Sequence, residues 1–275
     1  MWLLKLGLAL LAGYMALLLA IYLAQGWLLF PAWMGGGAVA PLPSGAQRLG
    51  VTVDGGERLT GLHLPPMQPM AEGPPPLLIG FGGNAWNADN MAIYLRGLYP
   101  QAEIATFHYR GYGPSEGRPS ASALLADALV IHDFLARRFP GRLPVAVGIS
   151  LGSGVAAHLA AERRLAGLIL VSPFDSLALV AQDHYWWLPV RQLFRHPMES
   201  AASLRGLATP VALIAAERDS IIRPPRTAAL RAAISNPVLD RVIAGADHND
   251  LFNRPDFVAA MQEALRLILV AEAKP

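Results

Sequence analysis

A serine held between two glycines, in Gly148-x-Ser150-x-Gly152, is the first feature of the sequence that could do chemistry. It follows a short apolar run and opens a helical stretch, the strand–turn–helix setting that a serine nucleophile requires. The tight turn would project the hydroxyl above a sheet, where side chains at either glycine position would collide with neighbouring backbone. The sequence therefore predicts Ser150 as a nucleophile, with a structural turn that does no chemistry as the alternative.

The same pattern occurs a second time, in Gly113-x-Ser115-x-Gly117. This copy lies in a run of glycine, proline and arginine, and no helical stretch starts directly behind it. Glycines in such a run are typical of turns. We therefore expect Ser115 to have a structural role.

A serine hydroxyl becomes a nucleophile when a histidine accepts its proton and a carboxylate holds that histidine. His248 lies in a polar loop just after the last strand-like run, so we predict it as the base. In open α/β sheets, sites form at the carboxyl ends of the strands. His184 and His196 lie in an aromatic-rich insert, and we expect them to pack or to face solvent.

Asp219 follows the strand-like run 211–215 and precedes His248, so it is the predicted orienting acid. The chain order serine, acid, histidine is the one that a strand–turn–helix nucleophile uses. Asp175 also follows a strand-like run and is the leading rival. Asp247 and Asp250 are too close to the histidine in sequence to orient it easily, and we expect them to brace its loop.

A glycine-rich segment, 80–85, follows the strand-like run 76–81. Glycines there let backbone amides approach a reacting carbonyl, so the N–H of Asn84 or Gly83 and that of Leu151 are the predicted oxyanion hole. The alternative is a plain glycine-rich turn. A phosphate-binding loop is excluded, because no Gly-Lys-Ser or Gly-Lys-Thr follows.

Composition excludes several other chemistries. The chain has no cysteine, which rules out a thiol nucleophile, disulfides and thiolate metal sites. The seven histidines show no metal-ligand spacing, so we predict neither a metal nor a cofactor. The net charge is +2 and the basic residues are scattered, so we predict no nucleic-acid partner.

Strand-like and helix-like stretches alternate through most of the chain, which is typical of an α/β fold with a parallel sheet. The first two strands are expected to form an antiparallel hairpin. The predicted strands are 47–53, 58–64, 76–81, 103–109, 143–149, 167–171, 211–215 and 238–243, and the predicted helices are 88–98, 121–139, 151–164, 223–233 and 255–271.

The first 30 residues form one apolar stretch that is uncharged from residue 6 to residue 24. About 20 helical residues cross a bilayer core of roughly 30 Å, so we predict a single-pass anchor over 1–30. A cleaved signal peptide, with Ala38-Val39-Ala40 as its cleavage triplet, is the alternative. Lys5 favours the N-terminus inside and the main domain on the outer, extracytoplasmic side.

Residues 31–46 are rich in glycine, proline and alanine and are predicted to be a linker, followed by the main domain over 47–275. Within that domain, about 177–205 has the length of a short lid and contains Trp186 and Trp187. Ordinary helix packing is the alternative for this segment. An apolar cap would exclude water and contact an acyl chain.

Taken together, these motifs resemble the α/β-hydrolase superfamily. Within it they resemble a small, N-terminally membrane-anchored branch that includes protein depalmitoylases and serine-aminopeptidase-like proteins. The resemblance covers about 51–269, and it implies a mostly parallel central sheet with helices on both faces and a short lid. It is carried by Tyr109-Arg110-Gly111-Tyr112-Gly113, by Ser172-Pro173-Phe174, by Asp219 with Ile221-Ile222, by His248-Asn249-Asp250 and by Ser150.

Three positions depart from the family pattern. Gly82 stands where the family usually has histidine, Trp86 where it often has glycine, and His108 where it often has aspartate. We expect Trp86 to narrow or line an acyl pocket beside the oxyanion hole, with Trp186 and Trp187 contributing from the lid.

These residues predict a serine hydrolase that cleaves a carboxylic ester or thioester through an acyl-enzyme. The expected substrate is a small or acylated molecule, and the acyl length and the oligomeric state are left open. A peptidase is one alternative, with Asp183 and Glu199 as the only lid carboxylates able to hold an α-ammonium. A catalytically silent, membrane-tethered binding module is the other.

Overall fold

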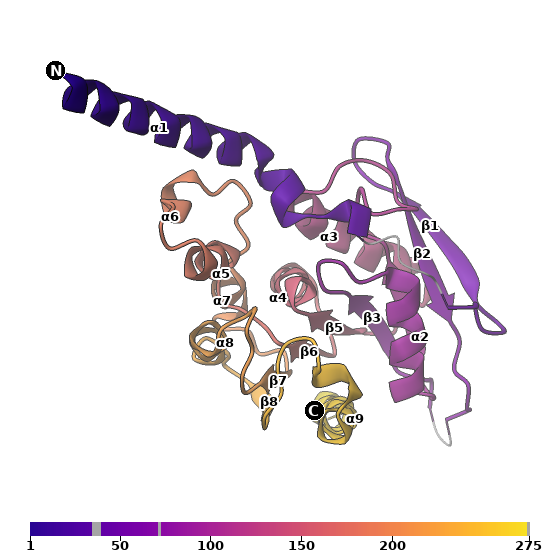
Figure 1. Ribbon diagram of the computed structural model, residues 1–275. Coiled ribbons are helices and arrows are strands. Elements are labelled where there is room, and N and C mark those ends of the chain that lie inside the picture. Colours follow the sequence, from indigo (N-terminus) through magenta and orange to yellow (C-terminus); the bar gives the residue numbers. More distant parts are fainter. Residues whose placement is uncertain (35–39, 71–72, 274–275) are drawn as a thin grey trace.

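A single eight-stranded sheet, in the order β1-β2-β4-β3-β5-β6-β7-β8, runs through the centre of the molecule (Figure 1). The computed structural model describes residues 1–34, 40–70 and 73–273. The strands are β1 (Gln47–Thr52), β2 (Arg58–Leu64), β3 (Leu77–Phe81), β4 (Glu103–Phe107), β5 (Val145–Ile149), β6 (Gly167–Val171), β7 (Val211–Ala216) and β8 (Pro237–Ile243).

Only β2 runs against the other strands of the sheet. β1 and β2 form the predicted hairpin, β2 pairs antiparallel with β4, and the remaining neighbours are parallel. The prediction of a mostly parallel sheet is therefore confirmed. Strand ends differ from the predicted ones by at most two residues, and β2 and β6 match them. β5, for example, begins at Val145 because Pro144 has no N–H to give to the ladder.

Helices cover both faces of the sheet, and each face has its own apolar core. The strands β3, β5, β6 and β7 are buried along their whole length, as a sheet covered on both sides requires. The helices α3 (Ala121–Arg138), α4 (Leu151–Glu162) and α8 (Pro224–Arg231) pack on one face. The helices α2 (Ala88–Leu98) and α9 (Pro255–Glu272) pack on the other.

Three short helices follow β6 and occupy the segment predicted as a lid. They are α5 (Leu177–His184), α6 (Val190–Leu193) and α7 (Ser200–Leu204). The last of them packs against α4, the helix that starts after Ser150. The tip between α5 and α6 carries the exposed side chains of Trp186 and Trp187.

The N-terminal helix α1 (Trp2–Leu29) runs out from the domain beside the lid (Figure 1). Within the described residues it is the one helix long and apolar enough to cross a membrane. Phe30, directly after it, is only 2% exposed and belongs to the core on the α3–α4 face. A short 3₁₀ turn, Ala32–Met34, follows. Positions 35–39, which include part of the predicted linker and most of the Ala38-Val39-Ala40 triplet, fall outside the described residues.

Candidate active site

Ser150 lies in the sharp turn between β5 and α4, with a φ of +52°. A positive φ of this kind is strained for every residue except glycine. The flanking glycines make the turn possible. A Cβ on Gly148 would lie 2.5 Å from the carbonyl oxygen of Gly152, and a Cβ on Gly152 would overlap the backbone of Phe81. The strand–turn–helix setting predicted around Ser150 is therefore present.

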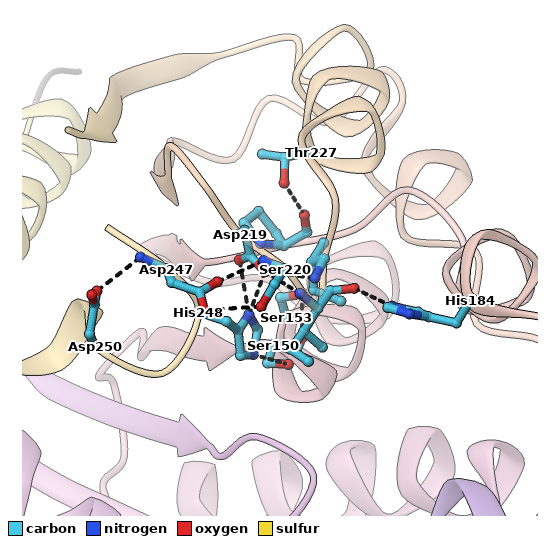
Figure 2. A network of polar contacts seen from close by, with 12 residues as sticks. Ser150, Ser153, His184, Asp219, Ser220, Thr227, Asp247, His248 and Asp250 are labelled. Atoms are coloured by element: carbon cyan, nitrogen blue, oxygen red, sulfur yellow. Dashed lines mark hydrogen bonds and ion pairs between the residues drawn. The ribbon is translucent and has the colours of Figure 1, made fainter. Parts of the chain in front are cut away.

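Figure 2 shows Ser150, His248 and Asp219 side by side, although they come from three distant segments. The distance from His248 Nε2 to Ser150 Oγ is 3.1 Å. On the other side of the ring, His248 Nδ1 lies 2.9 Å from both carboxylate oxygens of Asp219. This geometry lets the imidazole accept the serine proton at Nε2 while its Nδ1–H stays bonded to the carboxylate.

The Asp219 carboxylate is only 4% exposed and is held by its own loop. Its Oδ1 accepts hydrogen bonds from the backbone N–H of Ile221 at 3.0 Å and of Ile222 at 2.7 Å. A buried carboxylate with several donors is fixed in position. It can therefore hold His248 in a single orientation.

The histidine loop is braced by the two neighbouring carboxylates, as expected. Asp247 accepts hydrogen bonds from both the N–H and the hydroxyl of Ser220, at 2.7 and 3.0 Å. The Ser220 and His248 backbone bonds hold the pKa of Asp247 below its usual range. Asp250 in turn accepts from the Asp247 N–H at 2.9 Å. These bonds tie the histidine loop to the loop of Asp219.

The rival acid and the second serine have other partners. The Asp175 carboxylate lies 3.2 Å from Arg226, not against the histidine. Ser115 accepts from the Thr60 N–H at 2.9 Å and donates to the carbonyl of His108 at 2.8 Å. Both contacts are structural, so neither residue competes for the site.

Of the two rival histidines, His184 is exposed and His196 is packed, which agrees with the expectation that they pack or face solvent. His184 Nε2 lies 2.8 Å from the carbonyl oxygen of Ile221 and so joins the lid to the acid loop. The ring of His196 packs edge-on against Phe30, with ring centroids 5.2 Å apart.

The predicted oxyanion segment borders the nucleophile. A Cβ built on Gly83 would lie 3.6 Å from the Cβ of Ser150. Leu151 is the first residue of α4, and the first N–H groups of a helix have no acceptor within it. The oxyanion role of the N–H groups of Leu151 and of Gly83 or Asn84 stays a prediction.

The Asn84 side chain ties this segment to two other parts of the chain. Its Nδ2 donates to the carbonyl of Leu29, the last residue of α1, at 2.7 Å. Its Oδ1 accepts from the hydroxyl of Tyr112 at 2.8 Å. Burial raises the pKa of the Tyr112 phenol, so it stays a donor at neutral pH.

We therefore expect Asn84→Ala to lower kcat about tenfold and to leave KM nearly unchanged, because the backbone donor remains but loses its alignment. Tyr112→Phe removes only one of the two ties and should have a smaller effect. Steady-state kinetics on a short ester, beside thermal unfolding of each variant, would check this. A folded Asn84→Ala with wild-type kcat would contradict the positioning role.

The three tryptophans predicted to bind substrate lie in different places. Trp86 packs against Tyr94 and Phe252, with ring centroids 5.6 and 5.1 Å away, on the face of α2 and α9. Trp186 is 80% exposed at the lid tip. The carbonyl of Trp187 accepts from the hydroxyl of Tyr14 on α1 at 3.3 Å. Their role in substrate binding stays a prediction.

The chain is similar in sequence to known proteins. Residues 75–199 match the family described as alpha/beta hydrolase fold. An uncharacterized protein of Mycobacterium tuberculosis is 35% identical over 244 residues, which make up 86% of this chain and 83% of that protein. The chain belongs to the α/β-hydrolase family.

Two further proteins are similar to this α/β hydrolase. The lysophosphatidylserine lipase ABHD12 of Danio rerio is 34% identical over 140 residues, which are 43% of this chain and 36% of the lipase. A membrane phospholipase A, described as a bacterial virulence factor, aligns over 98% of this chain and 99% of its own, with a TM-score of 0.58. Its 17% identity supports a shared fold and nothing finer.

Sequence reasoning missed one buried polar residue of this α/β hydrolase. Gln25 in α1 is buried, and its Nε2 donates to the carbonyl of Leu193 at 2.8 Å. Its Oε1 accepts from the N–H of Arg195 at 2.9 Å. A lone glutamine in an apolar helix could have indicated this contact, because burial of an amide without hydrogen-bond partners costs free energy.

Proposed function

We propose that this α/β hydrolase is a membrane-anchored serine esterase that cleaves carboxylic esters or thioesters through an acyl-enzyme. The observation that carries the proposal is the placement of His248 between the Ser150 hydroxyl and the buried Asp219 carboxylate, at 3.1 and 2.9 Å. A serine next to a correctly held imidazole is an activated nucleophile.

In the first half of the reaction, Ser150 Oγ attacks the carbonyl carbon as His248 Nε2 takes its proton. The negative charge that develops on the carbonyl oxygen is held by the N–H of Leu151 and of Asn84 or Gly83. Breakdown of the tetrahedral intermediate expels the alcohol or thiol, which receives the proton from His248. The acyl group remains on Ser150.

In the second half, a water molecule attacks the acyl carbon and gives its proton to His248 Nε2. The carboxylic acid leaves, and Ser150 Oγ recovers the proton from the imidazolium. Asp219 accepts the His248 Nδ1–H throughout and stabilises the charged ring when it forms.

The peptidase alternative is less well supported, because the two lid carboxylates already have partners. Asp183 lies 3.2 Å from the Arg226 guanidinium, and Glu199 accepts from the hydroxyl of Ser176 at 2.9 Å. A free α-ammonium would have to displace one of these groups. The named activity of ABHD12, a lipase, also favours an ester substrate.

The proposal includes the anchor. The 28 residues of α1 are long enough to cross a bilayer core of roughly 30 Å. Lys5, the only charged residue of α1, favours an N-terminus on the cytoplasmic side and a hydrolase domain on the outer side.

Fluorophosphonate labelling of the full chain tests the proposal, with mass spectrometry to locate the adduct. We expect a single adduct on Ser150, turnover of p-nitrophenyl esters and little turnover of aminoacyl p-nitroanilides. A folded protein that is neither labelled nor active on any ester would favour the silent binding module. Faster turnover of the anilides would favour the peptidase.

A further inference from the structure

An apolar groove of about 220 Å³ lies between α1 and the lid. Its one amide, on Gln25, is already bonded to the main chain at positions 193 and 195 and so needs no partner from an occupant. The groove thus offers an apolar surface along most of its length. The lining includes Leu18, Ile21 and Leu29 from α1, and Trp187, Val190 and Phe194 from the lid.

The contacts between α1 and the lid set the depth of this groove in a membrane. The first hydrogen bond from α1 to the lid is made by the Tyr14 hydroxyl. The twelve helical residues before Tyr14 span about 18 Å, at roughly 1.5 Å per residue. A bilayer core is roughly 30 Å thick. If α1 crosses it, the lid tip must therefore enter the hydrocarbon, which suits the exposed ring of Trp186.

Tyr22, which lies partway along the groove, marks the level of the membrane surface. The Arg195 guanidinium lies over the ring of Tyr22, 4.8 Å from its centroid. Twenty residues from Trp2 end at Ile21, and about 20 helical residues match the bilayer core. Tyrosine and arginine are typical of the interface just beyond. The groove therefore extends from the region of the lipid chains at Leu18, past headgroup level, to Leu29 at the end of α1.

A short series of contacts joins the groove to the nucleophile. Leu29 lines the groove, and its carbonyl accepts a hydrogen bond from the Asn84 side chain at 2.7 Å. The neighbouring Gly83 lies against Ser150, with 3.6 Å between a Cβ built there and the serine Cβ. The Leu29 end of the groove thus lies next to the predicted oxyanion segment.

We infer that this groove binds the acyl chain of a single-chain membrane lipid ester, so that α1 is a wall of the substrate site. The inference rests on the proposed esterase function and names its substrate class. The size favours one chain, because pockets for drug-sized ligands hold about 300–1,000 Å³ and this groove is smaller. The ester would reach Ser150 from the membrane side.

Two neighbouring positions on α1 provide a matched test. Leu18 lines the groove, whereas Leu19 is exposed and does not. In phosphatidylcholine vesicles, Leu18→Trp should lower the ratio of kcat/KM for p-nitrophenyl dodecanoate to that for p-nitrophenyl butyrate at least about tenfold. Leu19→Trp should keep that ratio within about twofold of wild type. Equal ratios in the two variants would overturn the inference.

A binding measurement covers the case in which Leu18→Trp does not fold. Palmitic acid with a diazirine near its chain end, photolysed with the Ser150→Ala protein in vesicles, should label peptides of α1 and of the segment 187–194. Labelling confined to the Trp86 side of the site would overturn the inference. So would efficient disulfide dimerisation of Leu18→Cys in this cysteine-free chain, because a second copy would then occupy the groove.

These outcomes separate the inference from the proposed function. A wild-type protein that hydrolyses both esters and carries the fluorophosphonate on Ser150, but shows no groove labelling, defeats the acyl groove alone. A protein that hydrolyses neither ester defeats the esterase, and the inference that rests on it.

Discussion

Replacing Ser150 by alanine is expected to lower kcat for ester hydrolysis by roughly 10⁶-fold, because no other group can form the acyl-enzyme. KM should change little, since the binding surface remains. The measurement is turnover of a p-nitrophenyl ester at saturation, together with thermal unfolding. A folded Ser150→Ala protein that keeps more than about one hundredth of the activity would contradict the assignment.

Ser115→Ala is the matched control, because Ser115 lies in the same G-x-S-x-G pattern. Loss of the Ser115 hydroxyl leaves the Thr60 N–H and the His108 carbonyl without the hydrogen bonds of 2.9 and 2.8 Å that they now make to it. An unpaired buried group costs about 1–3 kcal/mol, so this variant should lose stability. Its activity should stay within about twofold of wild type at a temperature where it is folded.

Asp219→Asn is expected to lower kcat about 10⁴-fold. The amide has nearly the shape of the carboxylate, but its NH₂ donates where His248 Nδ1–H now donates. The imidazole would then carry its proton on Nε2 and could not accept one from Ser150, 3.1 Å away. Single-turnover kinetics with a chromogenic ester would locate the loss in acyl-enzyme formation. Near-normal acylation in a folded variant would contradict the role of Asp219.

Asp175→Asn is the control for this substitution. Asp175 also follows a strand and is also buried, but its carboxylate pairs with Arg226 at 3.2 Å. Burial raises the pKa of this carboxyl above its ordinary value. Neutralising it should change kcat less than about threefold, so a loss comparable to that of Asp219→Asn would reopen the choice of acid.

The turn that holds the proposed nucleophile, Ser150, could be predicted from sequence because its signals are local. The residues after each serine separate the two copies of its pattern: a helix begins at Leu151 after Ser150, while Ser115 stays in a turn. The position of His248 and Asp219 in the site could be predicted because the loops that follow parallel strands lie at the same edge of the sheet. The structure brings all three side chains together there.

The surroundings of the site could not be predicted in the same way, because they depend on packing between distant segments. No sequence pattern predicts that Trp86 packs with Tyr94 and Phe252 in an aromatic cluster on the face of α2 and α9. Likewise, no periodic pattern in the sequence predicts the hydrogen bond between Gln25 and Leu193, which lies 168 positions further along the chain.

Phe30 has a consequence for how such an enzyme could be released from its membrane. Its side chain fills the core beside α3 and α4, and the preceding carbonyl holds Asn84. A protease that sheds the domain by cutting after residue 30 would remove a core aromatic, typically a loss of about 3–5 kcal/mol, together with one support of the oxyanion segment. The end of α1 is therefore part of the folded domain, and shedding from the proposed anchor would act as inactivation rather than secretion.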